Sequence, residues 1–306
     1  MTRSRTVMLW RGIRKNWGLY LLLLPGMTLL ALFVYRPMYG ILIAFKDYVP
    51  RFGILGSPWA GFKYFRQFFN SFQFENTISN TILISLYGLG VSFPLPIVVA
   101  LCVNQMRVQK FRKIFQVATY LPHFISTVVL VGMMIIILSP TSGIVGNVAR
   151  LMGVEPVNAL GVPHWFRHIY IWSGVWQNTG WDSIIYLAAL SAVDPQLYEA
   201  ATVDGASKFQ KMVYIDVPML FPTMATLLIL RSGNIMSVGF EKVYLMQNPL
   251  NLLFSEIIST YVYKIGLLNA QYSFSSAVNL FNNVINFILL VTVNQISKYV
   301  SNNSLW

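Results

Sequence analysis

The sequence predicts an all-α membrane protein that crosses the bilayer six times. Of its 306 residues, 56% are hydrophobic and 10% are charged, whereas about 25% of the residues in ordinary soluble domains are charged. The charged residues lie in short gaps between long uncharged runs. Several of these runs reach the roughly 20 apolar residues that a helix needs to cross the hydrocarbon core. Composition and charge patterning together therefore argue against a soluble fold.

Six uncharged or nearly uncharged runs define the predicted spans. In chain order they lie within residues 17–35, 76–106, 114–149, 166–190, 217–240 and 265–297. Asp182 interrupts the fourth run and Arg231 the fifth. Because basic residues precede the first run, a cleaved signal peptide is the alternative there, but the stretch at 32–37 offers no small-x-small cleavage site. We therefore expect the first run to remain as a span.

The basic residues predict which side of the membrane the termini occupy. The chain has a net charge of +12, and lysine and arginine are enriched in cytoplasmic loops. Five basic residues precede the first span and indicate a cytoplasmic amino terminus, namely Arg3, Arg5, Arg11, Arg14 and Lys15. Four more follow the second span and indicate a cytoplasmic loop there, namely Arg107, Lys110, Arg112 and Lys113. The segment 36–75, which this topology places outside, also holds five basic residues and opposes the bias. With six spans, we expect both termini in the cytoplasm.

This topology divides the chain into a basic cytoplasmic terminus (1–16), a first span with an external segment (17–75) and a core of five further spans (76–306). In the external segment, phenylalanines at positions 62, 65, 68, 69 and 72 recur at helical spacing. The spacing favours an amphipathic helix whose rings anchor at the headgroup level. A platform for a ligand is the alternative.

No residue pattern in the sequence indicates an enzyme or a metal site. The single cysteine, Cys102, excludes disulfides and paired thiolate ligands, and His123, His164 and His168 lack the spacing of metal ligands. There is no Gly-x-x-x-x-Gly-Lys-[Ser/Thr] stretch, so the chain does not bind ATP as P-loop proteins do. The basic residues are spread over short gaps, which argues against nucleic acid as a partner. We expect no cofactor in this chain.

The gap between the fourth and fifth spans (194–218) predicts two short helices joined at a glycine. Asp194 can accept hydrogen bonds at a helix start, and Pro195 suits the first helical position. Gly205 can adopt a positive φ and end the first helix. Ser207 and Gln210 have capping-box spacing and can start the second. A plain connection between membrane helices can contain the same caps, so these features alone do not establish docking.

The residues of this loop resemble the EAA signature of permease subunits in binding-protein-dependent ABC importers. The matching positions are Glu199-Ala200-Ala201, Asp204-Gly205-Ala206 and Ile215-x-Val217-Pro218. Nine residues separate Gly205 from Ile215, as in the family, and Val217 stands where leucine is usual. We expect Pro218 to mark the point where the second short helix gives way to the fifth span.

The resemblance extends along nearly the whole chain and points to carbohydrate-type permeases. The segments similar to those permeases are Gly61-Phe62-Lys63-Tyr64-Phe65, Asn80-Thr81 and Tyr120-Leu121-Pro122. Within this group the chain resembles permeases for complex sugars and oligosaccharides, among them those of alginate importers. The resemblance implies a type I permease core in a bacterial inner membrane.

The resemblance also implies partners and a site. In the family, the motif forms cytoplasmic coupling helices that sit in a cleft of an ATPase and convert its closure into movement of the spans. The residues thereby assigned to ATPase docking are Glu199, Ala200, Ala201, Asp204, Gly205, Ala206, Ile215 and Pro218. The implied partners are a second permease of different sequence, two ATPase subunits that bind ATP-Mg, and an external solute-binding protein.

Polar side chains within the spans are candidates for a substrate pathway. Arginine at mid-span costs ~2.5–3.5 kcal/mol on insertion scales, so Arg231 should face protein or water. Asp182 is the carboxylate expected at comparable depth, and a structural pair with Arg231 and a substrate role are equally open. The asparagines of the sixth span share one helix face, where they either bond to other helices or line the route. The candidate pathway residues are Gln177, Asn178, Asp182, Arg231, Asn234, Asn279, Asn283 and Asn286.

The sequence thus predicts a permease subunit of an ATP-driven importer for an oligosaccharide or polysaccharide. An acidic, alginate-like substrate would give Arg231 an electrostatic reason to line the route. The tryptophans of the fourth span, Trp172, Trp176 and Trp181, fit interface anchors better than sugar-stacking platforms. The alternative function is an ion-coupled secondary transporter, which typically shows internal repeats and buried carboxylates. This chain has one such carboxylate and no evident repeat.

Overall fold

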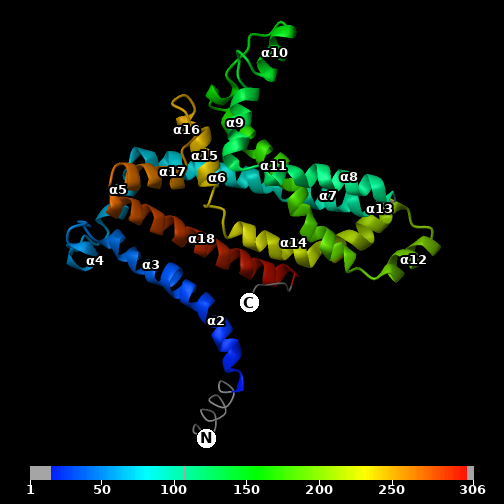
Figure 1. Cartoon of the computed structure of the whole chain (residues 1–306), viewed down its shortest axis with the longest axis horizontal. Coiled ribbons are helices and arrows are strands. Elements are labelled where there is room, and N and C mark those ends of the chain that lie inside the picture. Colours follow the sequence, from blue (N-terminus) through cyan, green and yellow to red (C-terminus); the bar gives the residue numbers. More distant parts are fainter. Residues whose placement is uncertain (1–14, 107, 302–306) are drawn as a thin grey trace.

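The computed structural model describes residues 15–106 and 108–301, and this part of the chain consists of helices and the loops between them (Figure 1). Within the described residues, β pairing is confined to an isolated bridge between Lys46 and Trp59. The all-α prediction is therefore confirmed. Several basic residues used to orient the termini lie outside the described residues, namely Arg3, Arg5, Arg11, Arg14 and Arg107.

The first span is a long helix whose beginning leads away from the other helices (Figure 1). It is built from α2 (Trp17–Leu30), η1 (Ala31–Tyr35), α3 (Arg36–Met38) and η2 (Tyr39–Phe45), and it runs for 29 residues. The predicted span stopped at residue 35. The helix continues through Pro37, which lies in α3, directly after the π-helical turn η1. No residue of α2 is buried within the described structure, so its apolar side chains are free to face lipid or another chain.

The aromatic helix of the next segment forms as α5 (Lys63–Phe69), after the short α4 (Gly53–Gly56). Phe68 is 1% exposed, and its ring lies 6.3 Å from the rings of Tyr261 and Phe274. The exposed residues of this helix are Lys63, Arg66, Gln67 and Phe69, and Phe62 before it and Phe72 in the next helix are exposed as well. One side of α5 is therefore held by the core of the protein itself, while the other side is available to a membrane surface.

The second span is continuous, whereas the third is broken. The helices α6 (Phe72–Ser92) and α7 (Pro94–Asn104) together run for 33 residues. The helices α8 (Gln109–Tyr120) and η3 (Leu121–Phe124) are followed by α9 (Thr127–Ile137) after a bend of 98°. The uncharged run 114–149 does not form one helix, because Ile125 is extended and the Ser126 side chain caps α9 by accepting from the amide of Val129. Figure 1 shows α9 and α10 (Ile144–Leu151) projecting from the bundle.

The predicted fourth span lies within the 27-residue helix α11 (Trp165–Ser191), which follows η4 (Ala159–Gly161). Among the described residues, four helices are long and apolar enough to cross a membrane, or five if the bent pair counts as one span. Helix α11 is not one of them. It packs against α6, α7, α8 and α14, and a helix covered by protein can carry more polar residues than one facing lipid.

The loop at 194–218 contains α12 (Pro195–Val203) and α13 (Lys208–Lys211), as predicted. Helix α13 continues through the π-helical turn η5 (Met212–Asp216) into α14 (Val217–Ser232), giving one helix of 25 residues. The expectation that Pro218 separates the second short helix from the fifth span is wrong. Pro218 lies in the first turn of α14, directly after the π-helical turn, and the helix continues through it.

The last part of the chain returns along the bundle. After α14 come α15 (Phe240–Met246), α16 (Leu252–Ser255), α17 (Ile258–Tyr263) and η6 (Lys264–Leu268), and then the long α18 (Tyr272–Ser301). The sixth span was predicted within the uncharged run 265–297, and the helix that is apolar and long enough runs from Tyr272 to Lys298. Helix α18 packs against η2, α5, α14 and α17, which brings the end of the first span and the last helix into one bundle.

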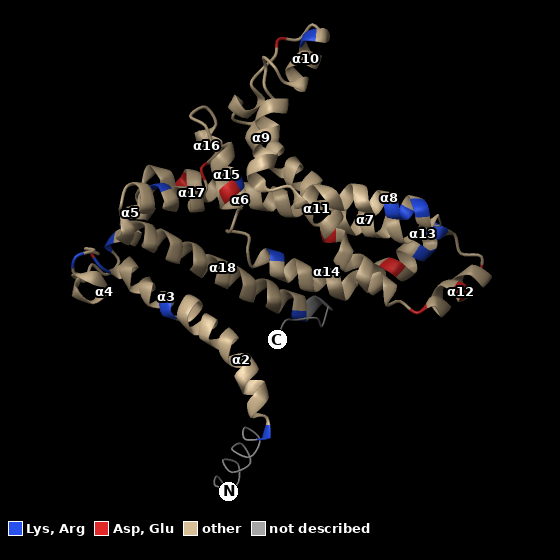
Figure 2. Ribbon diagram, viewed as in Figure 1, with Lys and Arg blue, Asp and Glu red and all other residues tan. Residues whose placement is uncertain are grey.

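Charge is distributed unevenly over this bundle. Figure 2 shows lysine and arginine gathered at the end where α8 and α13 lie, while most of the ribbon between the two ends is uncharged. The charges that remain away from the ends, such as Asp182 and Arg231, are the ones that need a partner.

Candidate functional site

The described structure contains a cleft of about 650 Å³ between α6, α11 and α14. The bend before α9, the segment that follows α14 and the start of α15 complete its wall. Five of the predicted pathway residues line it: Gln177, Asn178, Asp182, Arg231 and Asn234. These residues come from two regions that are distant in the sequence, so the tertiary structure brings them together.

Asp182 and Arg231, for which the sequence allowed a structural pair or a substrate role, form an ion pair on the wall of this cleft. A guanidinium nitrogen of Arg231 lies 2.6 Å from Asp182 Oδ2, and the two side chains are 33% and 30% exposed. The other terminal nitrogen of Arg231 donates to the Ser92 carbonyl at 3.3 Å. Pairing with Asp182 therefore leaves Arg231 partly accessible from the cleft.

A third charge in the cleft was missed by sequence reasoning. Lys242 lines the cleft, and its Nζ donates to the Tyr170 carbonyl at 2.9 Å and lies 5.0 Å from the centre of the Tyr170 ring. Among the described residues it belongs to none of the three ion pairs. The lining thus carries two cations, Arg231 and Lys242, against one carboxylate, Asp182. In the sequence, Lys242 looks like an ordinary loop charge beside Glu241.

His123 and Trp181 fix the bent third span against α11. Their rings stack with centres 4.5 Å apart and an angle of 4° between them. His123 Nδ1 lies 2.9 Å from Asn178 Oδ1, and Gln177 Nε2 donates to the Ile125 carbonyl at 2.7 Å. One face of the Trp181 ring is therefore covered by His123, although the residue is 40% exposed, and Gln177 and Asn178 shape the cleft as well as line it.

The asparagines of α18 do not line the cleft. Asn286 accepts from the Met236 amide at 3.0 Å and donates to Ser237 at 2.9 Å, so it holds α18 to the segment after α14. Asn279 lines a second hollow of about 450 Å³ beside Phe240 and Tyr263. Asn283 is exposed on α18, apart from the described residues that line either hollow. Of the two alternatives left open for these residues, Asn286 bonds to another segment, and none of the three lines this cleft; their place on the substrate route stays a prediction.

The caps predicted in the 194–218 loop are confirmed. Asp194 accepts from the Gln196 amide at 2.9 Å, and Gly205 has φ +77°. Ser207 and Gln210 form both hydrogen bonds of a capping box, at 2.7 and 3.3 Å. These local interactions depend on near neighbours, which is why the sequence could predict them.

The surface of this loop is open. Glu199, Ala200, Asp204 and Gly205 are exposed, while Ala201, Ala206 and Ile215 are half-buried and Pro218 is exposed. Two large apolar side chains that the motif does not include, Val203 and Phe209, are 88% and 68% exposed. An exposed apolar pair flanking a rigid glycine turn is typical of a protein interface.

Behind this surface lies a buried carboxylate that sequence reasoning did not single out. Asp216 is completely buried and accepts from the Tyr198 hydroxyl at 2.5 Å and from Gln105 Nε2 at 2.9 Å. Asn104 Nδ2 lies at 3.5 Å. Burial, followed by the hydrogen bond to Asp216, raises the pKa of Tyr198 to about 12, so this hydroxyl remains a donor throughout the physiological range.

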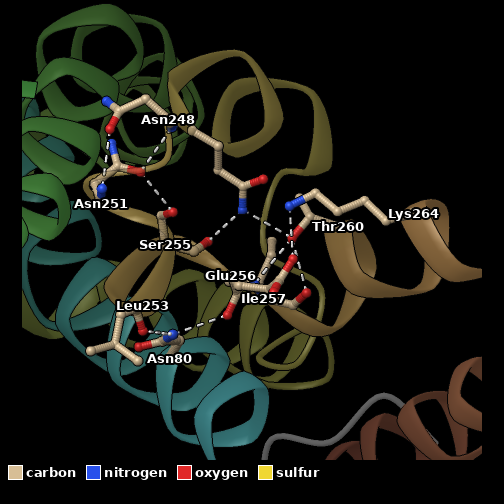
Figure 3. Close-up of polar contacts among 10 residues, drawn as sticks. Asn80, Asn248, Asn251, Leu253, Ser255, Glu256, Ile257, Thr260 and Lys264 are labelled. Carbon is tan, nitrogen blue, oxygen red and sulfur yellow. Dashed lines mark hydrogen bonds and ion pairs between the residues drawn. The ribbon is translucent and has the colours of Figure 1, made fainter. Parts of the chain in front are cut away.

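At the other end of the bundle, a polar network holds the turn at 247–256 in place (Figure 3). Asn80 Nδ2 on α6 donates to the carbonyls of Leu253 and Glu256 at 2.9 and 3.0 Å, and Thr81 accepts from the Ile258 amide at 3.1 Å. Asn251 is completely buried and bonds to the Met246 carbonyl. The Asn80-Thr81 pair, noted in the sequence for its resemblance to sugar permeases, thus fixes the connection between α16 and α17.

Comparison with known proteins gives one family. The family described as the binding-protein-dependent transport system inner membrane component matches residues 92–300. The chain is 42% identical, over 92% of its length and 87% of the relative, to the polygalacturonan/rhamnogalacturonan transport system permease protein of Bacillus subtilis. It is 26% identical, over 74% of its length and 76% of the relative, to the trehalose/maltose transport system permease of Thermococcus litoralis.

Two solved structures share the whole fold. The first belongs to a bacterial ABC transporter involved in the import of the acidic polysaccharide alginate; the identity is 40%, the TM-score is 0.90, and 96% of this chain and 99% of that chain are covered. The second is an alginate ABC transporter in complex with an alginate pentasaccharide-bound periplasmic protein; the identity is 39%, the TM-score is 0.90, and the coverage is 97% and 99%. The described arrangement of helices is thus that of type I importer permeases.

Proposed function

This chain belongs to the family of binding-protein-dependent transport system inner membrane components, and from that premise we propose that it carries an acidic oligosaccharide through the cleft between α6, α11 and α14. It is an integral inner-membrane permease of a sugar or polysaccharide ABC importer, and not a catalytic enzyme. Family membership decides against an ion-coupled secondary transporter.

The charge of the cleft is the observation that supports an acidic substrate. Arg231 and Lys242 outnumber Asp182, and Lys242 has no carboxylate partner among the described residues. A cation without a counterion in a partly desolvated cleft favours an anionic ligand, because the ligand's carboxylate replaces lost hydration. The names of the similar proteins, which specify polygalacturonan and alginate, agree with a uronate-containing substrate.

In this proposal the chain works with separate subunits. A cytoplasmic ATPase pair binds ATP-Mg and hydrolyses it, and the 194–218 loop docks on that pair through Glu199, Ala200, Asp204 and Gly205. The basic residues at the end of the bundle near α8 and α13 support placing this end and both termini in the cytoplasm. A second permease of different sequence completes the route, and a solute-binding protein delivers the saccharide from outside.

The sharpest test of the substrate is Lys242→Gln, because this change removes a cation without breaking an ion pair. We expect the kcat/KM for uptake of oligogalacturonate by the full importer in proteoliposomes to fall by about tenfold, as for a lost charge-assisted hydrogen bond. Arg231→Gln should also weaken uptake while leaving assembly of the complex intact. Lys298→Gln, at an exposed lysine on α18, is the matched control.

The outcomes separate the parts of the proposal. Unchanged uptake in Lys242→Gln and Arg231→Gln would remove these residues from the pathway. The energy source is tested in the same vesicles: uptake must require ATP inside the compartment that holds the ATPase, and an ion gradient must not replace it. Uptake driven by a gradient alone would contradict the importer assignment.

A further inference from the structure

We propose that Asp216 is a positioning residue that transmits movement of α12 to the transmembrane helices. The inference rests on the coupling role proposed for the 194–218 loop, and it concerns a residue to which the motif assigns no identity. Asp216 occupies the variable position between Ile215 and Val217, so the resemblance assigns it no role.

Helix α12 is attached to the rest of the described structure by few polar contacts. It has no buried residue. Beyond its own turns and caps, two of its side chains make hydrogen bonds: Lys211 Nζ donates to Thr202 at 2.6 Å, and the Tyr198 hydroxyl donates to Asp216 at 2.5 Å and also bonds to Asn104. Lys211 belongs to α13, the other short helix of the same loop. Because α13 is continuous with α14, both bonds tie α12 to the helix that crosses the membrane, and the bond between Tyr198 and Asp216 is the one that ends on a completely buried side chain.

Asp216 is also bonded to a second transmembrane segment. Gln105, directly after α7, donates to its other carboxylate oxygen at 2.9 Å, and Asn104 lies within 3.5 Å. One carboxylate thus joins α12, the end of α7 and the start of α14. Neutral donors satisfy it, and no cation pairs with it in the described chain.

Burial makes these bonds stiff. A buried carboxylate is costly wherever it lacks donors, because it has given up its hydration. Asp216 is completely buried. If Tyr198 is displaced, either Asp216 moves with it or the Asp216 carboxylate loses one of its hydrogen-bond donors. Movement of α12 is therefore passed on to α14 and α7 in preference to being absorbed by the loop.

The π-helical turn η5 orients the Asp216 carboxylate toward α12 and the end of α7. Asp216 is the last residue of η5 (Met212–Asp216), which inserts a wider turn into the otherwise continuous α13–α14 helix. Such turns rotate the side chains that follow and are frequent at functional sites. Here the turn lets the helix continue while Asp216 points inward to Tyr198 and Gln105.

The test variant is Tyr198→Phe, which removes the hydroxyl and keeps the ring. In the complete importer, in proteoliposomes supplied with oligogalacturonate and the solute-binding protein, we expect saccharide imported per ATP hydrolysed to fall by about tenfold, the usual worth of a hydrogen bond to a charged group. Tyr214→Phe is the matched control: Tyr214 lies on η5, is 76% exposed, and should transport like the wild type.

A second variant distinguishes coupling from a merely structural role. Asp216→Asn places an amide N–H₂ group against one of the present donors, Tyr198 or Gln105. We expect it to lower the amount of saccharide imported per ATP hydrolysed. The double variant Tyr198→Phe/Asp216→Asn should be no worse than Asp216→Asn alone, because both changes break one shared contact. Less assembled complex with an unchanged transport-to-hydrolysis ratio would show a structural role and overturn the inference.

Gly205→Val, which strains the same loop at its positive-φ turn, separates this inference from the function on which it rests. If Gly205→Val uncouples hydrolysis from transport while Tyr198→Phe does not, Asp216 is not the link and the coupling role of the loop stands. If both variants couple as the wild type does, the coupling role itself fails.

Discussion

The ion pair between Asp182 and Arg231 places two opposite charges on the wall of the cleft, each about one third exposed. The sequence left a structural pair and a substrate role equally open, since it shows two charges in different spans but not their distance. The structure shows that the pair forms and that it lines the cleft. A partly exposed pair costs less to separate than a fully buried one, so a substrate carboxylate can compete for Arg231.

Breaking this pair gives a prediction for stability. Asp182→Asn leaves Arg231 without its counterion, and we expect the detergent-solubilised complex to lose about 1 kcal/mol, a value discounted for solvent screening. Arg231→Gln should cost less in the Asp182→Asn background than alone, because the partner is already gone. Thermal unfolding of the four proteins measures both effects. Strictly additive losses would show that the pair contributes nothing.

The turn between α12 and α13 depends on the backbone freedom of one residue. Gly205 has φ +77°, and apart from the glycine and its two chain neighbours no described atom lies within 4 Å of where its Cβ would be. The strain of a substitution there would thus come from the backbone and not from crowding. The surrounding caps are local, so the whole element is fixed by residues within a few positions of one another.

Gly205→Val should therefore distort this element selectively. A β-branched residue at positive φ costs on the order of 1–3 kcal/mol, and we expect saccharide-stimulated ATP hydrolysis to be uncoupled from uptake. Gly153→Val is the control, because Gly153 has φ +71° and is equally uncrowded but lies in the loop after α10. Full saccharide-stimulated hydrolysis and uptake in Gly205→Val would refute the assignment of this loop to coupling.

At the scale of the whole molecule, the bundle includes a close contact between the backbones of α8 and α11 that could not be predicted from the sequence. A Cβ on Gly180 of α11 would lie 2.2 Å from the Thr119 carbonyl of α8, so these helices touch backbone to backbone. This contact lets α8 pack on α11 before the 98° bend turns α9 away from the bundle.

Gly180→Ala should thus weaken the assembly of the bundle. The added methyl group must push α8 from α11, and overpacking of this kind costs about 1–3 kcal/mol. Gly132→Ala is the matched control, since Gly132 is also helical and none of the described atoms lies within 4 Å of the place that an added methyl group would take; it should be neutral or slightly stabilising. Thermal denaturation of the purified permease pair compares them. Equal melting temperatures would contradict the close approach.

The sequence by itself determined the features that depend on near neighbours or on local composition. Apolar runs predicted the long helices, because about 20 apolar residues suffice to cross a bilayer. The caps at Asp194, Gly205 and Ser207 were predictable because their partners lie within three residues or because they need only a backbone angle. The motif around Glu199 identified the family for the same reason.

The tertiary structure alone decided which distant residues meet. It showed that Asp182 pairs with Arg231, that Lys242 enters the cleft and that Asp216 meets Tyr198 and Gln105. The structure also shows that the third predicted span is bent and that α13 and α14 form one continuous helix. The asparagines of α18 are not among the residues that line the cleft. These outcomes depend on packing between segments many residues apart, and hydropathy and spacing carry no information about such contacts.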